Sequence, residues 1–159
     1  MSLLDKEPVK RAEKVLKNFD PKMNIIILEE SARTAFDAAN SLKCENGAII
    51  KSLLFKAKSS FILCLVSGDK KCSLNRLKKI INIKDISMAS PEEVKTQTGY
   101  TIGGVSPVGH SNKIEILIDN SLERFIDLYA AAGHPNCVFK INFKNLQKIT
   151  NGTLKDLIE

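Results

Sequence analysis

The chain has 159 residues, of which 24 are lysine or arginine and 18 are acidic, so its formal net charge at pH 7 is +6. Hydrophobic residues make up 43% and charged residues 26%, which is ordinary for a soluble globular protein, and this length predicts one domain over residues 1–159. The start of the chain lacks the apolar core of a signal peptide, and the longest apolar run, 61–66, is too short to cross a bilayer. We therefore expect a cytoplasmic protein that does not interact with membranes.

Charge and cysteine content narrow the classes of ligand. A positive balance is typical of proteins with a polyanionic partner such as nucleic acid, although lysines can also simply solvate helix faces. There is no CxxC pair and there are only two histidines, so neither a zinc site nor a disulfide framework is expected. We expect no metal and no cofactor, and no oligomeric state is indicated. The thiols are expected to be buried or free at Cys44, Cys64, Cys72 and Cys137.

The first half of the chain has the pattern of a helix, a strand, a second helix and a hairpin. Apolar residues at helical spacing predict a helix over 8–19, and the apolar run 24–28 predicts a strand. Ser31 is predicted to be the N-cap of the second helix. The stretches 48–55 and 61–66 are separated by a short polar turn and are expected to pair as a hairpin.

The first hairpin strand contains one residue that breaks its pattern. Alternation places Ile49, Lys51, Leu53 and Phe55 on one face of the strand, with Ser52 on the other. Lys51 is the exception on an otherwise apolar face. It is either a lysine that snorkels from the rim of a strand or a functional cation.

The second half predicts further short elements. Ser90-Pro91-Glu92-Glu93 combines a capping box with proline at the first helical position, so a helix should begin there and end at Gly99. Hairpin-length connections favour antiparallel pairing, and the expected fold is α/β, with a curved, largely antiparallel mixed sheet or partial barrel surrounded by helices. The other expected elements are a helix at 73–81, strands at 85–89, 113–118, 128–132 and 137–141, a helix capped by Asn142 and one more turn at 153–158.

The segment Thr98–His110, TGYTIGGVSPVGH, holds four of the eight glycines and Pro107. Two residues are enough to reverse a chain, so thirteen residues rich in glycine indicate a shaped loop whose N–H groups converge on a ligand. The alternative is an ordinary connection between two elements. Ile102, Val105 and Val108 are expected to anchor the loop, which makes disorder improbable.

Three segments, AIIKSLLF, GYTIGGVSPVGH and AAAGHPN, occur in an order and spacing that resembles the YbaK/EbsC family of freestanding aminoacyl-tRNA deacylases. That family is related to the editing domain inserted in bacterial prolyl-tRNA synthetases. The resemblance extends from about Asn24 onward. It implies a pocket on a curved sheet, the acceptor end of aminoacyl-tRNA as substrate, and a prolyl-tRNA synthetase as a further partner. The implied reaction is ester hydrolysis on mischarged tRNA, such as tRNA(Pro) carrying Cys, Ala or another small amino acid.

The resemblance also assigns residues. Lys51 matches a lysine regarded as essential in the family, and Gly103 with Pro107 matches its GxxxP loop. His134 lies in the AGHP segment, where some members carry a functional histidine. Ser52 stands where some members have asparagine, which leaves the amino acid removed open. The substrate-binding residues implied are Ser52, Val105, Ser106, Pro107 and Gly133.

The chemistry of these residues suits ester hydrolysis. Negative charge develops on the former carbonyl oxygen, and the N–H groups of Gly103, Gly104 and Val105 could stabilise it. Lys51 could hold the terminal phosphate, the ribose or the oxyanion, and His134 could orient water or bind the substrate amine. There is no G-x-S-x-G nucleophile elbow, so water or a group of the substrate itself is the expected attacking species.

Two other classes remain open at this point. A non-catalytic tRNA- or nucleotide-binding module could keep the same pocket, with the glycines serving as turn residues. A cysteine hydrolase would require Cys64 or Cys137 beside a histidine.

Overall fold

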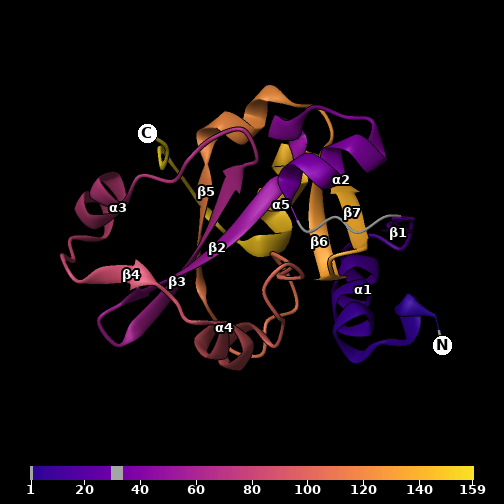
Figure 1. The fold of residues 1–159 in the computed structure, drawn as a ribbon, viewed down its shortest axis with the longest axis horizontal. Helices are drawn as coiled ribbons and strands as arrows, with labels where there is room; N and C mark the ends of the chain where they lie inside the picture. Colours follow the sequence, from indigo (N-terminus) through magenta and orange to yellow (C-terminus); the bar gives the residue numbers. More distant parts are fainter. Residues whose placement is uncertain (1, 30–33) are drawn as a thin grey trace.

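The computed structural model describes residues 2–29 and 34–159 and has an α/β fold with two sheets (Figure 1). The smaller sheet is antiparallel, and in the larger one β3 pairs with β5, and β5 with β8, in parallel. The predicted class is confirmed, and the strands form two sheets where one curved sheet was expected. The order of strands across the smaller sheet is β1 (Ile25–Ile27), β7 (Cys137–Ile141) and β6 (Leu128–His134). The order across the larger sheet is β4 (Ile86–Met88), β2 (Ile50–Ala57), β3 (Ser60–Ser67), β5 (Glu115–Asp119) and β8 (Thr153–Lys155).

Most helices begin where the sequence predicts. Ser90 caps its helix with the full reciprocal capping box, and Asn142 accepts a hydrogen bond from the N–H of Asn145. Thr34 caps α2, whereas the predicted cap Ser31 lies outside the described residues. The helices are α1 (Glu7–Phe19), α2 (Ala35–Leu42), α3 (Leu74–Ile81), α4 (Pro91–Thr98) and α5 (Phe143–Thr150), with short 3₁₀ helices at Leu3–Asp5, Asn46–Ala48 and Asn120–Arg124. None of these helices is long and apolar enough to span a bilayer.

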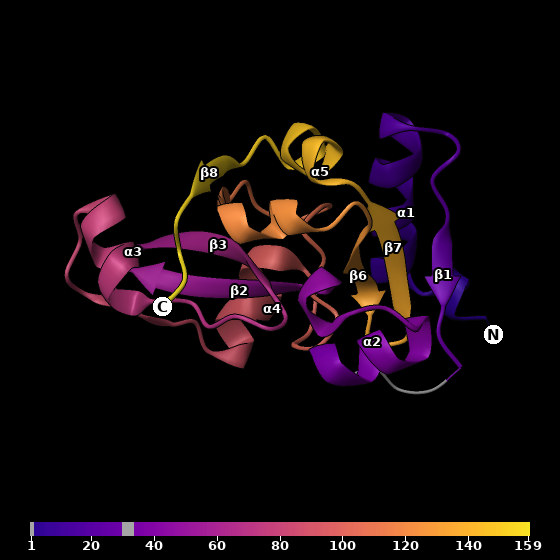
Figure 2. The same cartoon turned by 90° about the horizontal axis from the view of Figure 1, so that it is seen from above.

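The larger sheet separates two apolar clusters. Ile50 and Leu54 of β2 belong to a cluster that also includes residues of α1, β6 and β7, while Leu53 and Phe55 belong to a cluster beneath α3. The predicted alternation of β2 is therefore confirmed. Helices α1 and α3 lie at opposite ends of the molecule in both views (Figures 1 and 2).

The expected helical turn at 153–158 is wrong. Helix α5 ends at Thr150, and the left-handed conformation of its C-cap Asn151 (φ 54°) redirects the chain. Residues 153–155 then pair in parallel with the edge of β5 as strand β8. An exposed strand edge offers a row of main-chain hydrogen-bonding groups, and that tertiary opportunity overrides the weak helical pattern of a short segment.

The two sheets meet at one isolated parallel bridge between Ile49 and Tyr129. Beyond this bridge the two strands do not pair, because β2 belongs to the larger sheet and β6 to the smaller one. On the side of β2 away from β3, strand β4 pairs only with residues 55–57. The stretch of β2 between the bridge and β4 is therefore covered by neither neighbouring strand.

Candidate functional site

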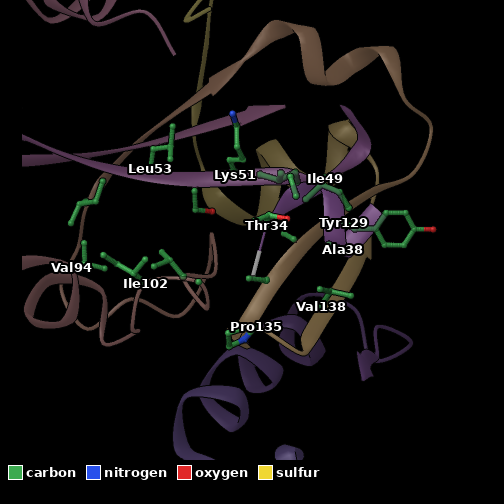
Figure 3. A pocket seen from close by; sticks show the side chains of 18 of the residues that line it. Thr34, Ala38, Ile49, Lys51, Leu53, Val94, Ile102, Tyr129, Pro135 and Val138 are labelled. Carbon is green, nitrogen blue, oxygen red and sulfur yellow. The ribbon is translucent and has the colours of Figure 1, made fainter. Parts of the chain in front are cut away.

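A cavity of about 260 Å³ lies where β2 and β6 separate (Figure 3). Its walls come from six segments that are far apart in the chain, and most of them present apolar side chains. The lining residues are Thr34, Ala35 and Ala38 of the α2 region, 49–54 around β2, Met88, Ala89 and Val94 around α4, Ile102, Gly103 and Val105 of the glycine-rich loop, Tyr129, Ala130 and Ala131 of β6, and Pro135 and Val138.

The start of α4 explains why β2 is open at the cavity. The Ala89 N–H donates to the Leu54 carbonyl at 3.0 Å, which extends the β4 pairing by one residue. Continuing this antiparallel register would place Pro91 opposite Ser52. Pro91 has no N–H and is already the first residue of α4, so the chain leaves the edge of β2 there.

Lys51 belongs to the lining, but its ammonium group is directed away from the cavity. The Lys51 Nζ donates to the main-chain carbonyl of Lys70, and Figure 3 shows Lys51 and Leu53 extending from one side of β2 while Ile102 and Pro135 lie on the other. Burial lowers the pKa of Lys51, and the nearby Cys72 and Asp69 partly offset this effect. The side chain is therefore a half-buried cation held at the rim by one neutral acceptor.

The glycine-rich loop brings two of its predicted residues to the cavity. Gly103 (φ 95°) and Val105 line the cavity, and no hydrogen bond within the described residues uses either N–H. Gly104 is buried behind them, with its N–H donated to the Thr101 carbonyl at 3.0 Å. A Cβ at Gly104 would lie 2.9 Å from the His134 nitrogen, so only glycine allows this close approach of the loop to β6.

Ser106 and Pro107 are buried within the loop and do not line the cavity. The Ser106 hydroxyl accepts a 3.4 Å hydrogen bond from the Val108 N–H, and the main-chain carbonyl oxygen of Ser106 lies 2.7 Å from Nε2 of His110. Val108 is buried as expected. Ile102 is not an anchor, because 61% of it is exposed at the mouth of the cavity.

His134 lies beside the loop and does not itself line the cavity. Its Nδ1 accepts a 3.0 Å hydrogen bond from the Asn136 N–H, which leaves Nε2 to carry the proton of the neutral ring. Burial, together with the positive charge of Lys6, lowers the pKa of His134. Gly133 connects this turn to the loop, since its N–H donates to the Gly104 carbonyl at 3.1 Å.

Arg11 of α1 carries no functional signal in the sequence, and the structure shows that it anchors the loop. Its Nε donates to the Gly109 carbonyl at 2.7 Å, and its guanidinium lies 4.6 Å from the centre of the Tyr100 ring. The Tyr100 hydroxyl in turn donates to the Val108 carbonyl at 2.6 Å. No sequence motif marks this role, because one arginine among three lysines on an amphipathic helix gives no sign of its partner.

Comparison with known proteins gives a consistent result. Residues 29–149 match the model of a family described as the aminoacyl-tRNA editing domain. The chain is 32% identical over 123 residues to the protein YwhH of Bacillus subtilis, covering 77% of this chain and 78% of YwhH. It is also 32% identical over 119 residues to the proline–tRNA ligase of Kosmotoga olearia, covering 75% of this chain and only 19% of that ligase.

A solved structure of a proposed trans-editing enzyme for prolyl-tRNA synthetase superposes on this fold with a TM-score of 0.91. The two chains are 32% identical, and the match covers 97% of this chain and 98% of the other. The similarity therefore includes the arrangement of both sheets and not the sequence motifs alone.

Proposed function

The chain belongs to the aminoacyl-tRNA editing domain family, and on this premise we propose that it hydrolyses the ester of mischarged aminoacyl-tRNA. The substrate class we favour is tRNA(Pro) carrying a small amino acid such as Ala, Cys or Ser. The observation that carries the proposal is the small, largely apolar cavity, which is lined by Gly103 and Val105 with N–H groups that no described residue accepts from, and which has a cationic side chain at its rim.

The N–H groups of Gly103 and Val105 are the proposed donors to the developing oxyanion. Preorganised main-chain donors in an apolar site stabilise that charge strongly, because water does not compete for them. Gly104 contributes to the reaction by holding the loop against β6, since its own N–H is engaged with Thr101. His134 and Gly133 secure the opposite side of this contact.

Lys51 supplies the positive charge. Its flexible four-carbon side chain carries three donors and can exchange the Lys70 carbonyl for an anionic oxygen of the substrate that reaches the rim of the cavity. An anionic oxygen is a better partner for a half-buried ammonium than a neutral carbonyl is, so substrate binding favours the exchange.

The size of the cavity supports selectivity for small aminoacyl groups. Ile102 and Val105 narrow it from the loop side and Val94 from α4. An apolar pocket excludes larger side chains by sterics but separates near-isosteres by only about 1–3 kcal/mol. Ala, Ser and Cys esters are therefore all expected to be cleaved to some extent.

A cysteine hydrolase is disfavoured by the positions of the candidate thiols. Cys64 and Cys137 are fully buried and neither lines the cavity. Burial raises the pKa of Cys137, and the neighbouring Cys72 side chain together with burial raises the pKa of Cys64. Thiols in such surroundings are poor nucleophiles.

The test is a deacylation panel with tRNA(Pro) and non-cognate tRNAs charged with Ala, Cys, Ser, Thr and an aromatic amino acid. We expect turnover of the small esters in many-fold excess over protein and no hydrolysis of the aromatic ester. Tight binding of the same tRNAs without turnover would instead identify a binding module. Partnership with a prolyl-tRNA synthetase can be examined in parallel by adding the synthetase and asking whether mischarged tRNA(Pro) still accumulates.

A further inference from the structure

The main chain of Ser52 faces the cavity. In an antiparallel strand, the N–H and C=O of one residue point to the same side, and this side alternates along the strand. Because the Leu54 carbonyl accepts from Ala89, the main chain of Leu54 faces away from β3, and that of Ser52, two residues earlier, does the same. Ser52 thus presents one main-chain donor and one main-chain acceptor to the space that a neighbouring strand would occupy.

This open edge results from two specific features. Strand β4 ends its pairing at residues 55–57, and Pro91 turns the chain into α4 at the position that would face Ser52. On the other side, the bridge between Ile49 and Tyr129 holds β6 at the start of the gap. An exposed strand edge is a ready template for another extended segment.

The charges around the cavity define the kind of group that fits. No acidic side chain occurs among the described lining residues, and the acceptors that these residues offer to a cationic amine are carbonyl and hydroxyl oxygens. The Lys51 ammonium does not compete for the same space, because it extends to the opposite side of β2. Ser52 lies between the Ile49–Tyr129 bridge and the Ala89–Leu54 hydrogen bond, and its main-chain donor and acceptor both face the gap.

We propose that the aminoacyl group binds to Ser52 as a one-residue extension of the sheet. The Ser52 carbonyl accepts a hydrogen bond from the α-ammonium of the amino acid, and the Ser52 N–H donates to the ester carbonyl oxygen. This inference rests on the proposed function and specifies which main-chain groups bind the aminoacyl part of the substrate. It places the reacting carbonyl in the cavity that Ser52 lines together with Gly103 and Val105, whose N–H groups are the other proposed donors.

The first experiment uses the unmodified protein. A hydrolysis-resistant analogue, 3′-alanylamino-3′-deoxyadenosine, is titrated into ¹⁵N-labelled protein, with the corresponding propionyl compound as the matched analogue lacking the amine. The Ser52 amide resonance should shift downfield with the alanyl compound, and the propionyl compound should bind about tenfold more weakly, as expected for loss of one charge-assisted hydrogen bond. An unmoved Ser52 amide while the loop amides shift, or equal affinity for both analogues, would overturn the proposal.

The second experiment removes the donor. S52P deletes the N–H that points away from β3, which is tolerated where a strand has no neighbour on that side, and S52A is the reference that removes only the side-chain hydroxyl. Single-turnover deacylation by S52P should be at least about tenfold slower than by S52A, with melting curves confirming that both variants fold. Rates within threefold of each other (about 0.65 kcal/mol or less) would contradict the assignment. If the wild-type protein deacylates nothing, the proposed function fails, and the titration still decides the role of Ser52.

Discussion

At the level of single residues, Lys51 is a charged side chain among apolar neighbours on β2. It is half-buried on a face of β2 that is otherwise apolar, and burial lowers its pKa. A group that is held in an unfavourable environment by a single neutral acceptor contributes little to folding. Such local conflict is typical of positions retained for function.

Lys51→Met tests this interpretation, because it keeps most of the side-chain volume and removes the charge. Deacylation in single turnover should fall by about two orders of magnitude, by analogy with the loss of an oxyanion-stabilising donor. The melting temperature should stay the same or rise slightly. Lys56→Met is the matched control on the same strand, since Lys56 pairs with Glu93 outside the cavity. A near-normal rate with a clear drop in melting temperature would identify Lys51 as structural.

His110 gives a prediction about pH. Burial lowers its pKa, the Ser106 carbonyl partly opposes this, and Arg11 adds to the lowering. Between the folded pKa and the unfolded value, the unfolded chain binds more protons, so the free energy of unfolding falls as the pH drops through this window below about 6.5. His110→Gln can still donate to Ser106 but cannot titrate. Its loss of melting temperature between about pH 7 and pH 5 should be smaller than that of the wild type. Equal losses would show that His110 does not contribute to acid sensitivity.

Among the elements, helix α1 and the glycine-rich loop act as one unit through Arg11. The loop is closed at its base by hydrogen bonds from Ser111 and Asn112 to the main chain of 97–98, and Arg11 ties its C-terminal end to α1 through Gly109. The N–H groups of the loop therefore depend on a helix that begins some ninety residues earlier in the chain.

Arg11→Met removes this connection while keeping an apolar side chain over Tyr100. We expect a loss of about 1.5–3 kcal/mol, the usual contribution of a hydrogen bond from a charged group, and a melting temperature lower by several degrees. Deacylation should also decrease, with partial recovery in Arg11→Lys. Lys10→Met, an exposed neighbour on the same helix, serves as the control. Unchanged melting in Arg11→Met would mean that the loop keeps its shape without this anchor.

Elements with strong local signals could be predicted from the sequence. The capping box at Ser90, the cap at Asn142 and the alternation in β2 are short-range patterns, and the structure contains all three. Strand β8 could not be predicted, because its extended form depends on the edge of β5, some 36 residues away in the pairing of Leu117 with Thr153. The division into two sheets likewise depends on tertiary contacts.

The same distinction applies to the site. The glycine-rich loop and Lys51 stand out in the sequence because they break local rules. The open edge at Ser52 does not, since it follows from where β4 stops pairing relative to β2. Arg11 was missed for the same reason, because its partners Gly109 and Tyr100 become neighbours only in the folded chain.

At the scale of the whole molecule, the structure shows where some of the basic residues behind the net charge of +6 lie. Helix α1 starts beside the end of β6, since a Cβ at Gly133 would lie 2.7 Å from the main chain of Pro8. Lys10 and Lys14 are exposed one turn apart on this helix. Like charges at this spacing are mildly destabilising, so a polyanion bound along α1 would relieve their repulsion. Helix α3 lies at the other end of the molecule (Figures 1 and 2).

Binding of tRNA should therefore depend strongly on salt and more on α1 than on α3. With about three phosphate contacts, affinity should fall by about an order of magnitude or more between about 50 and 200 mM salt, because bound lysines release counterions. Lys10→Glu with Lys14→Glu should weaken binding and reduce the salt slope by about two, whereas the control pair, Lys79→Glu on α3 with Lys84→Glu just after this helix, should have a smaller effect. Filter retention across a salt series measures both quantities. Affinity that is indifferent to salt would exclude phosphate contacts as the main source of binding, and equal effects of the two pairs would show that the RNA does not follow α1.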